Sequence, residues 1–273
     1  MTSSALAQQR EQTPQNRLAS VQHVMVGGVK TACLSRAELA SLMAEDCLAR
    51  RNENKPPALV FDSNGHGISL AASSQAFQAD LAQADIVHAD GGIIVFAANK
   101  LTDGQIGDRS ATTDFLYDAV EAAVKHGLSF YFFGGTEAIN AKCVDILREQ
   151  YPDLNIIGRR NGYFSSQEEE EICREISALK PDIVWVGLGK PKEQSFCVRN
   201  RDKIVAGWLV TCGGCYNYVT GDYPRAPQWM QDRGLEWLHR MCTKPKQLFW
   251  RYLTTNPHAL YLIATRTQKR VLS

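Results

Sequence analysis

Residues 181–189 read PDIVWVGLG, a continuous run of β-branched and aromatic residues that ends on glycine. Such a run is typical of a strand that is covered on both faces, as in a parallel sheet. Five more runs of this kind occur at residues 57–61, 84–91, 128–135, 154–158 and 207–214. The last four runs of the chain start at residues 128, 154, 181 and 207, a regular spacing that leaves room for one helix between successive strands.

Helical patterns fill these intervals, at residues 113–127, 137–152 and 165–181. The first ends on Gly127, a typical residue just past a helix end, and the third contains Ser166 and Glu169 at the spacing of a capping box. Strand and helix alternation with this period predicts a doubly wound α/β domain with a mainly parallel sheet.

Composition places the chain among globular proteins, with 273 residues, 44% hydrophobic and 22% charged. We find no apolar run long enough for a membrane-spanning helix. Residues 1–20 are polar and lack the apolar core of a secretory signal, so we expect a disordered lead-in. The eight cysteines show no framework spacing, which favours reduced thiols in a cytosolic protein.

Charge is distributed unevenly along the chain. Residues 233–273 hold eight of the 30 Lys and Arg residues but only one acidic residue, Glu236. A basic tail on an acidic body suggests an anionic partner, namely lipid headgroups, a diphosphate or nucleic acid; the alternative is a solvated tail without a partner. Residues 248–270 mix aromatic, aliphatic and basic residues, which predicts a segment that lies in the headgroup region of a membrane. The alternative is packing on the body or on another copy of the chain, as in a homo-oligomer.

Glycine-rich and polar stretches follow the predicted strands: HADGG (88–92), FGGTE (133–137), GLGKPKEQ (187–194) and TCGGCYN (211–217). Ligands of open α/β sheets bind beyond the carboxyl ends of the strands. Glycine there lets backbone N–H groups approach phosphate closely, so these stretches predict a nucleotide-like ligand.

Carboxylates and an amide lie at two of these ends. Asp62 and Asn64 follow the first strand, and Asp90 precedes two glycines. A carboxylate in such a place can act as a general base, although Asp before Gly is also common in simple turns.

Cys212 and Cys215 form a CxxC pair, so a thiol or zinc role has to be weighed against a plain glycine turn. A structural zinc site needs a second ligand pair, but there is no second CxxC, and the six histidines are not spaced as zinc ligands. The pattern favours the glycine turn and predicts no metal site. The GLG at residues 187–189 is an incomplete dinucleotide fingerprint, which counts against a nicotinamide-dependent dehydrogenase, and no nucleic-acid-binding motif is present.

From about residue 22 to residue 255 the chain resembles the WecG/TagA/CpsF glycosyltransferases of bacterial surface-polysaccharide and teichoic-acid synthesis. The matching stretches include DSNGHG (62–67), ADIVHADGGIIVFA (84–97), GDRSATTDF (107–115), PDIVWVGLGKPKEQSF (181–196) and RAPQWMQDRGLEWLHR (225–240). The resemblance implies a Rossmann-like domain over residues 21–240 and a basic helical appendage over residues 241–273, which contacts the membrane and the acceptor diphosphate.

The same resemblance implies the reaction. It is an inverting transfer, without metal or cofactor, of a hexose or hexose derivative from a UDP-sugar to a polyprenyl-diphosphate-linked saccharide. The protein would work peripherally at the cytoplasmic face of the cell membrane, in exopolysaccharide or other cell-surface glycan synthesis.

Residue roles follow from the matched motifs. Asp90 is the expected base, and the other expected catalytic residue, Asn64, would orient the acceptor or donor sugar by hydrogen bonding. The expected donor site consists of Gly134, Gly135, Gly187, Gly189, Glu193, Gln194, Gly214 and Asn217. The expected acceptor and diphosphate site consists of Asp62, Arg109, Arg225, Arg240 and Arg251.

The chain departs from the family pattern at three places. Asp62 stands where the family has Thr, Glu193 and Gln194 exchange the usual amide and acid, and Tyr216-Asn217 replaces Phe-Asp. These changes leave the donor sugar open and motivate one alternative, a homologue that binds a UDP-sugar without catalysis.

Overall fold

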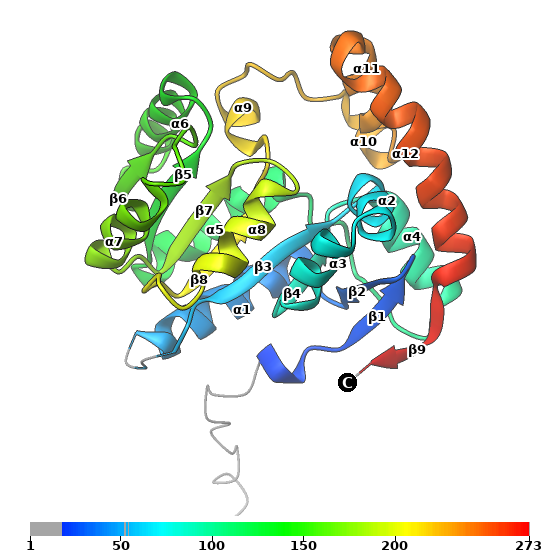
Figure 1. Ribbon diagram of the computed structural model, residues 1–273, viewed down its shortest axis with the longest axis horizontal. Helices are drawn as coiled ribbons and strands as arrows, with labels where there is room; N and C mark the ends of the chain where they lie inside the picture. The colour runs from blue at the N-terminus through cyan, green and yellow to red at the C-terminus, as the bar shows by residue number, and fades with distance from the viewer. Residues whose placement is uncertain (1–17, 52, 54, 273) are drawn as a thin grey trace, which may run out of the picture.

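A six-stranded parallel sheet forms the centre of the computed structural model, which describes residues 18–51, 53 and 55–272 (Figure 1). Its strands lie in the order β4-β3-β8-β7-β5-β6. They are β3 (Ala58–Ser63), β4 (Ile86–Ala89), β5 (Ser129–Gly134), β6 (Asn155–Arg160), β7 (Ile183–Gly187) and β8 (Trp208–Thr211). All six strands expected from the sequence are therefore confirmed.

Helices cover both faces of this sheet. One face packs on α1 (Arg36–Arg50), α5 (Thr112–His126) and α6 (Glu137–Gln150). The other packs on α2 (Gly65–Ser73), α3 (Gln75–Ala82), α4 (Gly92–Leu101), α7 (Glu169–Leu179) and α8 (Lys192–Asn200). Successive residues of β7 alternate between the two cores, with Ile183 and Trp185 in one and Val184 and Val186 in the other. The doubly wound, Rossmann-like α/β fold is confirmed.

Two helix ends test the local predictions. Gly127 ends α5 in the left-handed region with φ of 62°, as expected. The capping box expected between Ser166 and Glu169 is wrong, because Ser165 and Glu168 form the pair instead, one residue earlier. The Glu169 carboxylate is already bound by the guanidinium of Arg199, so it is not free to cap its own helix.

A second, antiparallel sheet joins the two ends of the described chain. It contains β1 (His23–Val26), β2 (Val29–Ala32) and β9 (Gln268–Leu272) in the order β2-β1-β9. Sequence analysis predicted none of these short strands. The signal it missed is the Gly27-Gly28 pair, where both residues have positive φ, 58° and 85°, as a two-residue hairpin turn requires.

The segment expected as a basic helical appendage is helical, and it packs on the body. Within residues 241–273 lie the end of α11 (Glu236–Thr243), all of α12 (Pro245–Arg266) and the strand β9, whereas α9 (Cys215–Val219) and α10 (Gln228–Asp232) precede them. The long helix α12 lies against α2 and buries Ala259, Leu262 and Ile263 (Figure 1). One face of the tail thus packs on the body, which was the alternative to a purely membrane-bound segment.

Within the described ranges, no helix combines the length and the apolar character that are needed to cross a bilayer. Of the expected lead-in, residues 1–17 lie outside the described residues. Leu18–Ser20 form a 3-10 helix, and Leu18 packs against the core.

Gly134, at the end of β5, has the tightest backbone surroundings of the glycines described. Its φ is 131°, and a Cβ there would lie 2.2 Å from the carbonyl oxygen of Gly187. We therefore expect Gly134→Ala to lower the free energy of unfolding by about 3 kcal/mol or more, from strain and overlap together. The control Gly221→Ala has φ of 77° and open space around the added methyl, so it should cost only about 1–2 kcal/mol. Urea unfolding of both variants measures the difference, and equal losses would contradict this account.

Candidate active site

The candidate site lies at the carboxyl edge of the parallel sheet. Strand β8 lies between β3 and β7, so the three loops that follow these strands are neighbours. The chain leaves β3 toward β4 on one side, whereas β7, β5 and β6 lie on the other side of β8. Such a reversal of strand order is where open α/β sheets bind their ligands.

Asn64 and Asp90, the expected catalytic pair, are in direct contact here. The amide nitrogen of Asn64 donates to Asp90 Oδ2 at 3.0 Å and to Asp62 Oδ2 at 3.1 Å. Its amide oxygen caps α2 by accepting the Gly67 N–H at 3.0 Å. The Thr112 N–H, at the start of α5, donates to Asp90 Oδ1 at 2.8 Å. Residues at the starts of two helices, α2 and α5, thus fix the Asp90 carboxylate.

Electrostatics keep Asp90 ionised. Burial raises the pKa of Asp90, but the charge of Lys190 and the hydrogen bonds from Asn64 and Thr112 more than offset it, so this pKa lies below its usual range. The side chain is half-buried, and Asp90 Oδ2 accepts only the hydrogen bond from Asn64 among the described residues. Its remaining lone pairs can accept the proton of a substrate hydroxyl.

Lys190 is a site residue that the sequence analysis missed. Its ammonium forms an ion pair with Asp62, and both side chains are buried or nearly so, with 10% and 6% exposed. The Cε atom of Lys190 also lies 3.6 Å from the position of a Cβ on Gly67, which places it over the start of α2. The signal that could have found it is its position in the glycine-rich loop directly after β7.

Glu193 ties two glycine loops together. Its Oε2 accepts the N–H of Gly189 at 2.9 Å and that of Gly213 at 3.0 Å. The residue is fully buried, and burial, together with the charge of Asp62, raises the pKa of Glu193 to about 7 although Lys190 opposes the shift. Glu193, which was expected in the donor site, therefore holds the loops after β7 and β8 together by its own hydrogen bonds.

The expected donor-site residues all lie along this edge. Gly134 and Gly187 end β5 and β7, Gly135 and Gly189 follow them, Gly214 precedes α9, Gln194 lies in α8 and Asn217 in α9. Two of the glycine N–H groups are already bonded: that of Gly135 donates to the Gly187 carbonyl at 3.0 Å, and that of Gly189 to Glu193. Close backbone approach, rather than free N–H groups at these two positions, is what the glycines provide.

The residues next to the glycines are more buried than the sequence suggested. Gln194 has no exposed area and lies 3.4 Å from the Thr211 hydroxyl. Tyr216 is also buried, and its hydroxyl donates to the Trp185 carbonyl at 2.7 Å. Asn217 is half-buried and stays at the surface of the edge. Of the departures from the family pattern in this region, only Asn217 is placed to reach a ligand directly.

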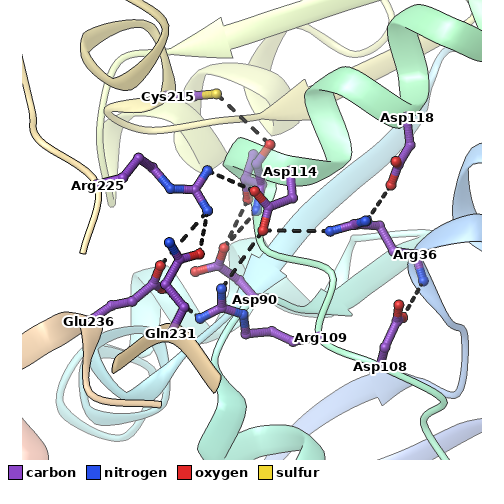
Figure 2. A network of polar contacts seen from close by, with 11 residues as sticks. Arg36, Asp90, Asp108, Arg109, Asp114, Asp118, Cys215, Arg225, Gln231 and Glu236 are labelled. Carbon is purple, nitrogen blue, oxygen red and sulfur yellow. Dashed lines mark hydrogen bonds and ion pairs between the residues drawn. The ribbon is translucent and has the colours of Figure 1, made fainter. Parts of the chain in front are cut away.

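Arg109 and Arg225 belong to a network of ion pairs (Figure 2). Arg225 Nη1 lies 2.7 Å from Asp114 Oδ1, and Arg109 Nη1 lies 2.5 Å from Glu236 Oε2. Arg225 also donates to the side chain of Gln231 at 2.8 Å. Together these contacts fasten the RAP segment, residues 225–240, to the first turn of α5.

Arg240 and Arg251 differ from that pair because neither forms an ion pair with a described residue. Arg240 lies over the ring of Tyr218, with 5.6 Å to the centroid, and Arg251 over that of Tyr252 at 5.0 Å. The pKa of His66 is lowered to about 4 by burial and then by the charges of Arg251, Lys190 and Arg240. Arg240 and Arg251 thus form a cationic cluster beside the start of α2, next to an uncharged His66.

The CxxC pair occupies structural positions. Cys212 follows β8 and Cys215 opens α9; both are buried, and burial raises the pKa of each thiol well above its usual value. Neither is therefore an activated thiolate. Among the described residues no group of three or more His, Cys, Asp or Glu side chains is arranged to hold a metal ion.

Comparison with known proteins agrees with this geometry. The sequence profile of the glycosyl transferase WecG/TagA/CpsF family matches residues 24–271. The chain is 27% identical over 221 residues to the N-acetylglucosaminyldiphosphoundecaprenol N-acetyl-beta-D-mannosaminyltransferase of Bacillus spizizenii. That match covers 81% of this chain and 84% of the relative. The profile spans both sheets and the C-terminal helices, so the chain belongs to the glycosyl transferase WecG/TagA/CpsF family.

Proposed function

We propose that this glycosyltransferase moves a hexose or hexose derivative from a UDP-sugar to a polyprenyl-diphosphate-linked saccharide, with inversion and without a metal ion. The observation that carries the proposal is the ionised Asp90 carboxylate, held by Asn64 and Thr112 at the carboxyl edge of the sheet. The name of the Bacillus spizizenii relative describes transfer to a diphosphoundecaprenol-linked sugar, which supports an acceptor of the same class here.

Asp90 supplies the base in this proposal. A sugar hydroxyl is a weak nucleophile until its proton is removed as the new bond forms. The hydroxyl oxygen bonds to the anomeric carbon of the donor, the bond from that carbon to the UDP oxygen breaks, and the proton passes to Asp90 Oδ2. Attack from the face opposite UDP inverts the anomeric configuration.

We assign the donor to the glycine edge and the acceptor diphosphate to the cationic cluster. The ends of β5, β7 and β8 let the donor approach the backbone closely, and Asn217 lies at their surface. Arg240 and Arg251 have no carboxylate partner among the described residues, so a diphosphate can bind them without displacing an ion pair. Arg109 and Arg225 remain candidates for binding the diphosphate, but each would first have to break its ion pair with a carboxylate.

The outer face of α12 supports a peripheral position on the cytoplasmic face of the membrane. Its side chains include the exposed aromatic and aliphatic residues Phe249, Trp250, Leu253, Leu260 and Tyr261. No acidic residue follows Glu236, and Lys244 and Lys246 flank the start of this helix. Apolar side chains next to lysines fit the headgroup region of an anionic bilayer.

A non-catalytic UDP-sugar-binding protein is the second candidate. The Asp62–Lys190 ion pair favours it, since a buried salt bridge at the reacting edge restricts how a sugar can approach Asn64. Binding of UDP without transfer to any acceptor would support this candidate.

Removing the base should abolish transfer. Asp90→Asn keeps the shape and, with its amide oxygen toward Asn64, that hydrogen bond, although it gives up the one from the Thr112 N–H. It cannot accept the proton, so we expect a loss of at least about 100-fold in kcat. The assay incubates the protein with a panel of UDP-sugars and polyprenyl-diphosphate mono- and disaccharides, and mass spectrometry detects the lipid product. An unchanged rate would remove Asp90 from its role but leave the transferase intact. No product from any wild-type reaction, with UDP still bound, would favour the non-catalytic candidate.

The membrane assignment is tested without cutting α12, because deletion of residues 241–273 would also remove β9 and the buried face of α12. Trp250 is 71% exposed, so Trp250→Ser should reduce pelleting with anionic liposomes while leaving the fold intact. Tyr163→Ser is the matched control, since Tyr163 is 76% exposed but lies in the loop after β6, a strand on the opposite side of the molecule from α12 (Figure 1). Equal pelleting of wild type and Trp250→Ser would contradict the assignment.

A further inference from the structure

Lys190 links Asp62 and Glu193, two residues at which the chain departs from its family pattern, to the expected base, Asp90. Asp62 Oδ2 accepts from the Lys190 ammonium and also, at 3.1 Å, from the amide of Asn64. The same amide nitrogen donates to Asp90 Oδ2 at 3.0 Å. Lys190, Asp62, Asn64 and Asp90 thus form one continuous chain of contacts.

The carboxylates around Lys190 have little access to water. Asp62 is 5% exposed and Glu193 is not exposed at all. An ionised carboxylate in such surroundings is strongly unfavourable unless a cation or hydrogen bonds stabilise it. Asp62, Asp90 and Glu193 each interact electrostatically with the Lys190 ammonium, which is therefore their common counter-charge.

Other titratable groups facing Asp90 provide less positive charge. They are His88 on β4, Cys215 and Tyr218 on α9, and Arg240 on α11. Burial lowers the pKa of His88 and raises the pKa values of Cys215 and Tyr218, so all three are neutral near pH 7. Lys190 and Arg240 are the remaining cations, and the charge of Lys190 is the largest influence holding the pKa of Asp90 down.

We propose that Lys190 is a positioning residue of the active site: its ammonium, paired with the buried carboxylate of Asp62, keeps Asp90 ionised and Asn64 correctly oriented. This inference rests on the proposed function, because it assigns Lys190 a role in the reaction that Asp90 starts. Lys190 acts through Asp62 and Asn64 and does not need to touch the substrate.

The sign of the pH effect follows from the charges. With Lys190 present, Asp90 is deprotonated well below neutral pH, so the acid limb of kcat/KM lies at low pH. Without it, burial and the negative charge of Asp62 favour the protonated acid, which cannot accept a proton. We expect Lys190→Met to move the acid limb upward by about 1–3 pH units. Lys190→Arg keeps the positive charge, so it should move the acid limb of kcat/KM less than Lys190→Met does.

The same substitution in a second variant, in which Asp62 and Glu193 are replaced by amides, distinguishes this charge role from a direct contact between Lys190 and a substrate phosphate. In Asp62→Asn/Glu193→Gln the two carboxylates become amides of the same shape, so neither adds a negative charge that favours protonated Asp90. The acid limb of Lys190→Met should therefore lie at a lower pH in this background than in the otherwise wild-type chain. This background also protects against misfolding, because no buried carboxylate other than Asp90 then depends on Lys190. A loss that is equal at every pH, or an acid limb of Lys190→Met at the same pH in both backgrounds, would overturn the proposal.

A readout independent of transfer distinguishes failure of this inference from failure of the proposed function. Carbon-13 NMR of protein labelled at the Asp carboxyl carbons follows each titration directly. We expect one Asp signal of Lys190→Met to titrate about 1–3 pH units above its wild-type position. Identical titrations overturn the role of Lys190 even if wild-type protein transfers sugar. A shifted titration in a protein that transfers no sugar supports the charge role and rejects the proposed function.

Discussion

Burial of charge at the carboxyl edge of the sheet is the constraint on which the other features depend. Carboxylates stay ionised away from water only when cations and N–H groups surround them. Here the amide of Asn64, the start of α5 and the ammonium of Lys190 provide these partners from three separate loops. These loops must therefore lie close to the loop of Asp90, and Gly91 allows this for Asn64, because a Cβ on Gly91 would lie 3.3 Å from the Cα atom of Asn64.

The C-terminal helices serve this edge as well as the fold. Ion pairs of Arg109 and Arg225 hold the RAP segment on α5, and the same segment delivers Arg240 to the site. Beyond it, α12 packs on α2, and β9 closes the antiparallel sheet with β1. The outer face of α12 is left exposed, so one segment completes the fold, carries the cationic cluster and presents an apolar surface.

The sequence alone predicted the parts of the molecule that follow a strong local pattern. Six strands could be recognised from continuous apolar runs, whereas the roles of Asn64 and Asp90 were expected from the family resemblance, and their contact appears only in the folded chain. The short strands β1, β2 and β9 were missed, because four or five residues of mixed polarity give no clear period. Lys190 was missed because a lysine in a loop usually faces solvent, and only the folded chain brings Asp62 to it. Likewise, no sequence pattern shows that Arg109 and Arg225 are paired whereas Arg240 and Arg251 are not.

The central claim is that one edge binds both substrates around Asp90. A crystal structure with UDP and a short-chain prenyl-diphosphate sugar tests it most directly. The account predicts UDP along the ends of β5, β7 and β8, the second diphosphate on Arg240 and Arg251, and a sugar hydroxyl within hydrogen-bonding distance of Asp90 Oδ2. Ligands bound away from this edge, or a sugar that does not reach Asp90, would contradict it.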